Sequence, residues 1–152
     1  MRELIANKNF RLFWIGEAIS LLGDQFYLIA LPWLVLQLTG DPLVMGTVLA
    51  VAGIPRALFM LFGGVLADKF TPRLVMLASN LMRMVLVGGL AVVVLLGITD
   101  LWLIYLFALL SGLAGAFFYP AQSAIVPQLV ERDTLQLANT FTQGTVQLSL
   151  FT

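Results

Sequence analysis

Apolar residues dominate four long runs of this chain, and each run is ended by a short polar or charged segment. The runs cover about 12–38, 43–67, 74–98 and 101–130. They do not thin out into the one-sided stripes that helices of a water-soluble bundle show. Each run is long enough to cross the roughly 30 Å of hydrocarbon in a bilayer as an α-helix. The pattern therefore predicts an all-α integral membrane protein with four transmembrane helices.

The segment that follows, 135–152, begins like a fifth span but is rich in Thr, Gln and Asn. It stops without a flanking charge, and a natural membrane protein seldom ends partway through a span. We therefore expect a partial fifth helix and a truncated chain, with residues 1–152 forming a single transmembrane domain.

Composition supports the membrane assignment and narrows the function. The chain is 61% hydrophobic and only 11% charged, with a mean hydropathy of +1.00, whereas a soluble domain is roughly a quarter charged. It contains no Cys and no His, which removes the usual metal ligands and the usual acid–base group. The net charge is zero and no Walker-type loop is present. We expect neither an enzyme nor a cofactor, metal or nucleic-acid partner.

The charges of the connecting loops predict an orientation in the membrane. Asp41 and Asp100 occupy the two turns on one side, which contain no Lys or Arg. The basic residues outside the spans all fall on the other side: Arg2, Lys8, Arg11, Lys69, Arg73 and Arg132. Basic loops stay in the cytoplasm. We therefore expect a multi-pass protein of the cell (inner) membrane with a cytoplasmic N-terminus.

Four ionisable residues lie inside the predicted spans: Glu17, Asp24, Arg56 and Arg83. Such residues are costly in lipid and should face a partner or a water-filled cavity. Glu17 and Asp24 are nearly two helical turns apart and so share a face. By depth, Asp24 matches Arg56 best, and Glu17 with Arg83 is a second possible pair. These residues are either structural ion pairs or candidates for coupling to protons or substrate.

Small residues recur at a spacing that suits close helix packing. They are Gly46, Ala50 and Gly53 in the second run, and Ser111, Gly112, Gly115 and Ala116 in the fourth. Both sets predict packing faces within a helical bundle.

The turn after the second run carries a recognisable motif, GGVLADKFTPR at 63–73. It resembles the sequence between the second and third helices of the major facilitator superfamily, which is Gly, three residues, Asp, a basic residue, then Gly and further basic residues. Four positions match: Gly64, Asp68, Lys69 and Arg73. Thr71 replaces the usual Gly, and Pro72 replaces one of the basic residues.

Other segments resemble the macrolide-efflux and enterobactin-exporter branch of that superfamily, and together they extend over essentially the whole chain. They are NFRLFW at 9–14, SLLGD at 20–24, FFYPAQ at 117–122, VPQLV at 126–130 and LANT at 137–140 with Gln143.

The resemblance implies a chain that is part of an N-terminal six-helix half, with a C-terminal half missing. It further implies a cytoplasmic gating role for Asp68, Lys69 and Arg73, and a cavity-facing Asp24 that couples transport to protons or substrate. We expect a proton-coupled exporter of drug-like or siderophore-like small molecules. Its partners would be the lipid bilayer, the substrate, and the missing half or another copy of the chain.

Two alternatives remain open. The first is a small multidrug transporter that works as a homodimer of four-helix subunits, with Glu17 as the shared proton site. The second is a non-transporting membrane subunit or relic, in which the buried charges serve assembly alone.

Overall fold

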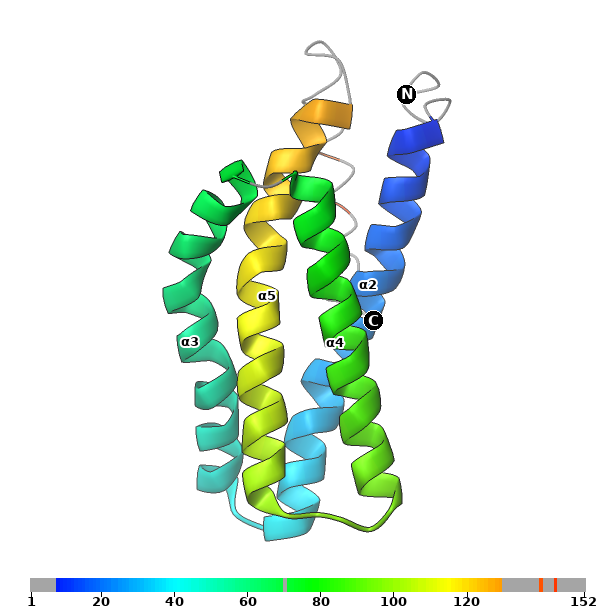
Figure 1. Cartoon of the computed structure of the whole chain (residues 1–152). Helices are drawn as coiled ribbons and strands as arrows, with labels where there is room; N and C mark the ends of the chain where they lie inside the picture. The colour runs from blue at the N-terminus through cyan, green and yellow to red at the C-terminus, as the bar shows by residue number, and fades with distance from the viewer. Residues whose placement is uncertain (1–7, 70, 130–139, 141–143, 145–152) are drawn as a thin grey trace. The chain divides into compact units, whose positions relative to one another are not determined.

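The computed structural model describes residues 8–69, 71–129, 140 and 144, with the backbone alone at 9, 10, 63–69 and 126–129. Four long helices account for nearly all of this part of the chain: α2 (Lys8–Thr39), α3 (Pro42–Lys69), α4 (Pro72–Leu95) and α5 (Leu101–Leu129) (Figure 1). Each contains a stretch long and apolar enough to cross a membrane. The predicted all-α membrane fold is confirmed. The predicted partial fifth span lies outside the described residues, apart from 140 and 144.

Local chemistry sets the turn between α2 and α3. Gly40 has φ +65° and donates its N–H to Leu36 O at 2.8 Å, which closes the last turn of α2. Asp41 then accepts the N–H of Leu43 on its Oδ1 at 2.8 Å, as a helix N-cap does. Pro42 occupies the first helical position, where no N–H is needed. Three consecutive residues thus end one span and begin the next.

Gly97 ends α4 in a Schellman motif. It has φ +77°, a conformation that side chains disfavour. The N–H of Ile98 bonds to Val93 O at 3.1 Å, and the N–H of Gly97 bonds to Val94 O at 3.0 Å. The helix therefore stops at Leu95, slightly before the predicted end at 98, because the apolar run continues through the cap.

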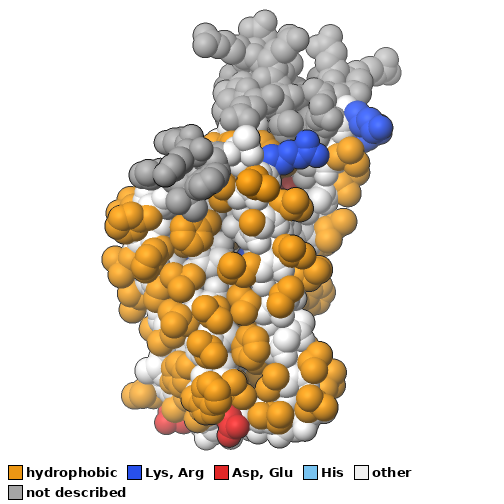
Figure 2. Space-filling view, in the orientation of Figure 1, with side chains coloured by type: hydrophobic (Ala, Val, Ile, Leu, Met, Phe, Trp, Pro, Cys, Tyr) orange, Lys and Arg blue, Asp and Glu red, His pale blue; other side chains and the backbone are white. Residues whose placement is uncertain are grey.

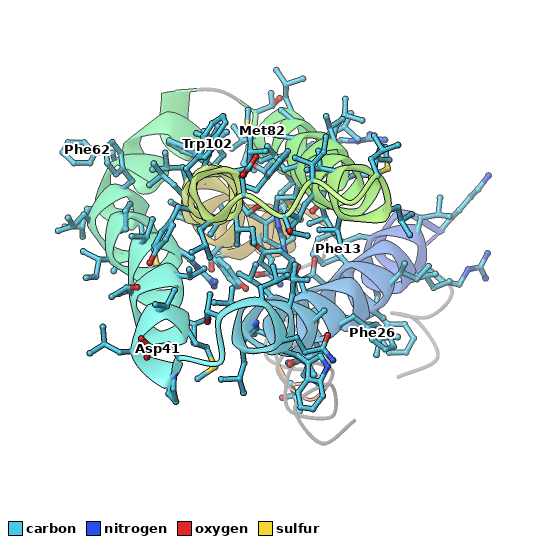
Figure 3. The ribbon with its side chains drawn as sticks, turned by 90° about the horizontal axis from the view of Figure 1, so that it is seen from below. Phe13, Phe26, Asp41, Phe62, Met82 and Trp102 are labelled. Carbon is cyan, nitrogen blue, oxygen red and sulfur yellow. The ribbon has the colours of Figure 1, made fainter. Side chains whose placement is uncertain are left out.

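The chain divides into two compact units, Met1–Leu28 with Ser123–Thr152 and Ile29–Gln122. In the second unit α5 lies between α3 and α4, as the view along the helices shows (Figure 3). The burial of the spans agrees with this arrangement, since 44% of an 18-residue apolar stretch of α5 is buried, against 6% for the corresponding stretch of α3 and 11% for that of α4. The central helix α5 therefore carries most of the packing in this unit.

Helices α3 and α5 run parallel and in register. Three contacts join them at successive levels: the hydroxyls of Thr47 and Tyr105, the backbone of Ala52 with Gly112, and the side chain of Arg56 with Gly115. In each pair the α5 residue lies 58 to 60 positions after its α3 partner. The residue numbers on α3 and on α5 rise together with a nearly constant difference. The two helices must therefore be parallel and stay adjacent over several turns.

Helices α3 and α5 approach each other closely at Gly112. A Cβ added there would lie 2.9 Å from the carbonyl carbon of Ala52 and 3.1 Å from its Cα, and closer still to its carbonyl oxygen. The packing face predicted on α5 is therefore confirmed at Gly112. On α3, by contrast, Gly46 and Gly53 have no described atom within 4 Å of an added Cβ.

The outer surface of the second unit suits lipid. Large apolar side chains point outward, with Leu61 80% exposed and Phe62 65% exposed, and Phe62 extends away from α3 in Figure 3. Figure 2 shows hydrophobic side chains over most of the visible face, with acidic side chains gathered at the end that carries the two turns. Asp41 and Asp100 are the exposed acids of those turns. A broad apolar surface ending in charged turns is the arrangement that a bilayer requires.

Candidate functional site

The two predicted carboxylates lie on the inward face of α2 in the first unit. Glu17 is only 3% exposed and Asp24 is half-buried. Leu21, on the same face between them, is 6% exposed, whereas Ile19 and Phe26 on other faces are 66% and 73% exposed. The helix therefore turns its acids away from the surface where lipid would lie. This burial agrees with the expectation that the acids face a partner or a cavity.

Arg56 occupies the middle of α3 in the second unit, about 20 Å from either helix end at 1.5 Å per residue. Its guanidinium lies over the ring of Tyr119, with Cζ 4.4 Å from the ring centroid. Gly115 lies beside it, and a Cβ there would lie 3.6 Å from both Cδ and Nε of Arg56, an ordinary van der Waals distance. The arginine side chain therefore packs against α5 beside Gly115 and Tyr119, which are one turn apart.

Arg83 approaches α5 from the other side, from α4. Its Cζ lies 5.6 Å from the centroid of the Phe118 ring, and Phe118 is 1% exposed. Phe118 and Tyr119 meet edge to face, with centroids 5.7 Å apart. Consecutive residues of an α-helix point about 100° apart. The aromatic pair can therefore meet one arginine from each flanking helix.

Arg56 has no described anion to balance its charge. It forms no hydrogen bond or ion pair with any residue that the structure describes, and its contact with Tyr119 is a cation–π contact. Such a contact contributes on the order of 0.5–2 kcal/mol. Placing an arginine at the centre of a span costs about 2.5–3.5 kcal/mol on insertion scales. The tyrosine ring thus offsets only part of the cost of this charge.

The expected pairing of Asp24 with Arg56 stays a prediction, because Asp24 belongs to the first unit and Arg56 to the second. The same holds for Glu17 with Arg83.

The predicted gating motif lies at the junction of α3 and α4. Gly64, Asp68 and Lys69 belong to the last turns of α3, and their side chains lie outside the described part of the chain. Arg73 is exposed in the first turn of α4, directly after Pro72. The helix boundaries thus place the motif in a helix–turn–helix connection, as its resemblance implied. Its gating role stays a prediction.

Sequence reasoning identified the two arginines but missed their aromatic partners. The signal that could have found Tyr119 is its spacing of one turn from Gly115, on the same face of α5. Phe118 gave no comparable signal, since an apolar residue in an apolar span does not show which way it faces.

The chain matches a family model described as transmembrane secretion effector over residues 4–149. Among curated relatives, it is 24% identical over 146 residues to the uncharacterized MFS-type transporter YvqJ of Bacillus subtilis, covering 96% of this chain and 35% of that protein. It is 24% identical over 141 residues to macrolide efflux protein A of Streptococcus pyogenes, covering 93% of this chain and 35% of that protein.

A third relative is the multidrug efflux pump Tap of Mycolicibacterium fortuitum, 30% identical over 132 residues, which are 83% of this chain and 32% of that protein. The chain therefore spans about a third of the length of the curated relatives it matches. No solved structure matches the chain.

Proposed function

Because the chain belongs to the transmembrane secretion effector family of major facilitator transporters, we propose that it is the N-terminal part of a proton-coupled exporter of drug-like or siderophore-like small molecules. The whole protein would be a secondary active transporter that exposes its central cavity alternately to the two sides of the membrane. Relatives named as macrolide and multidrug efflux proteins support the direction and the kind of substrate.

The observation that carries proton coupling is the pair of acids on the inward face of α2, with Glu17 3% exposed inside an apolar span. Ionisable residues that face the interior of a membrane bundle serve as proton relays in pumps and transporters. Asp24, half-buried on the same face, is the residue that we assign to coupling. The gating role proposed for Asp68, Lys69 and Arg73 would then control access from the cytoplasmic side.

The test is efflux of ethidium, a fluorescent lipophilic cation, from cells expressing the 152-residue chain alone or together with the segment encoded downstream of it. We expect efflux only when both are present. An uncoupler of the proton gradient should abolish it, and so should Asp24→Asn. Ser111→Ala, on α5, serves as a control substitution inside a span.

Each other outcome favours one of the alternatives. Proton-dependent efflux by the chain alone would overturn the fragment proposal in favour of a self-sufficient homodimer. A lack of efflux from a correctly inserted, complete pair would instead indicate a non-transporting membrane subunit.

The proposed orientation can be tested separately, because the chain contains no cysteine. Asp100→Cys and Thr71→Cys each place one thiol at an exposed position, on opposite ends of α4. A membrane-impermeant maleimide should label Asp100→Cys in intact spheroplasts, and Thr71→Cys only after lysis. The reverse pattern would place the N-terminus outside the cytoplasm.

A further inference from the structure

The guanidinium of Arg56 is a cation at the middle of a span. Its hydrogen-bond donors have no acceptor among the described residues. Its side chain is half-buried, so the group is neither sealed inside the protein nor fully exposed. It lies over the ring of Tyr119, and its side chain passes beside Gly115 of α5. The geometry is that of a preformed cation beside an aromatic face.

The acids of the second unit do not reach this group. Asp41 and Asp100 lie at the turns, and Asp41 precedes α3, about 20 Å along the helix from Arg56. Asp68 is near the opposite end of α3, three turns away. An anion that reaches the middle of the span must therefore come from outside this unit.

We propose that Arg56 and Tyr119 bind the acidic group of a lipophilic organic anion, such as an aromatic carboxylate, during transport. The inference rests on the proposed function, since it adds one class of molecule to those that the exporter would accept. The planar fork of arginine matches a carboxylate with two parallel hydrogen bonds. The tyrosine ring and the surrounding apolar span accommodate the rest of such a molecule.

A lipid headgroup is a less suitable source of the anion. Headgroups lie at the membrane surface, whereas Arg56 is about 20 Å from both ends of α3. A small amphipathic acid can enter the span and carry its carboxylate to that depth.

The test is equilibrium binding of pyrenebutyrate and of its methyl ester to the full 152-residue chain in nanodiscs of phosphatidylcholine, with empty nanodiscs subtracted. The two probes differ only in the carboxylate, so the ratio of their Kd values isolates the acidic group. We expect the acid to bind at least about tenfold more tightly than the ester, as two charge-assisted hydrogen bonds would give.

Arg56→Gln should bring this ratio close to one, and Arg56→Lys should retain part of it, because lysine keeps the charge but loses the fork. Tyr119→Leu should weaken binding of both probes and leave the ratio above one. Arg11→Gln, an exposed arginine of α2, is the matched control and should leave the ratio unchanged. If Arg56→Gln fails to fold, the lysine and leucine variants still test the site.

Three results would overturn the proposal. One is equal binding of acid and ester by the unaltered chain, and another is a ratio that survives in Arg56→Gln. The third is loss of the preference for the acid over the ester under either of two added conditions. Loss on adding phosphatidylglycerol to the nanodiscs would assign the anion to lipid, and loss when the downstream segment is present would assign it to the rest of the transporter. Because binding is measured without transport, these results are distinct from a failure of ethidium efflux.

Discussion

Replacing Gly112 with leucine is expected to separate α3 from α5 and to destabilise the second unit strongly. A Cβ at this position would already collide with the backbone of Ala52, and backbone atoms cannot move aside as a flexible side chain can. Overpacking a well-packed interior costs about 1–3 kcal/mol or more. Gly112→Ala should show a smaller loss in the same direction, and Gly112→Leu a loss at or above the upper end of that range.

The measurement is unfolding in detergent followed by circular dichroism, with Gly53→Leu as the matched control. Gly53 lies in the middle of α3 and has no described atom within 4 Å of an added Cβ. Its substitution should leave the unfolding midpoint nearly unchanged. Equal midpoints for the two leucine variants would contradict the close approach of α3 and α5.

Truncating Phe118 to alanine is expected to give the other large effect. Phe118 is 1% exposed, meets Tyr119 edge to face, and lies beneath the guanidinium of Arg83. In a bilayer the driving force for helix association is packing rather than escape from water. The cavity left by the ring therefore remains costly, on the order of 3 kcal/mol.

Phe62→Ala provides the control, because Phe62 is 65% exposed and points away from α3. Unfolding by sodium dodecyl sulfate should shift clearly for Phe118→Ala and by less than about 1 kcal/mol for Phe62→Ala, as expected of a surface position. A reversed order would mean that the aromatic pair does not form the interior of this unit.

Much of the architecture could be predicted from the sequence, because it depends on length and local chemistry. A helix must satisfy its own backbone hydrogen bonds in lipid, so twenty or more apolar residues predict a spanning helix without knowledge of its neighbours. The turn at Gly40, Asp41 and Pro42 likewise depends on residues adjacent in sequence. The end of α4 was misplaced by a few residues, because hydropathy does not register a cap at Gly97 inside an apolar run.

The contacts of the candidate site depend instead on how each helix is rotated and how far it slides along its neighbour. Depth alone suggested a carboxylate for Arg56, a pairing that stays a prediction, and gave no sign of the contact between its guanidinium and the Tyr119 ring. That placement follows from the register of α3 and α5, which the close approach at Gly112 allows. Rotation and register are properties of two packed surfaces together. The sequence by itself therefore determined which segments span the membrane and which charges they contain, and the tertiary structure alone decided which side chains those charges meet.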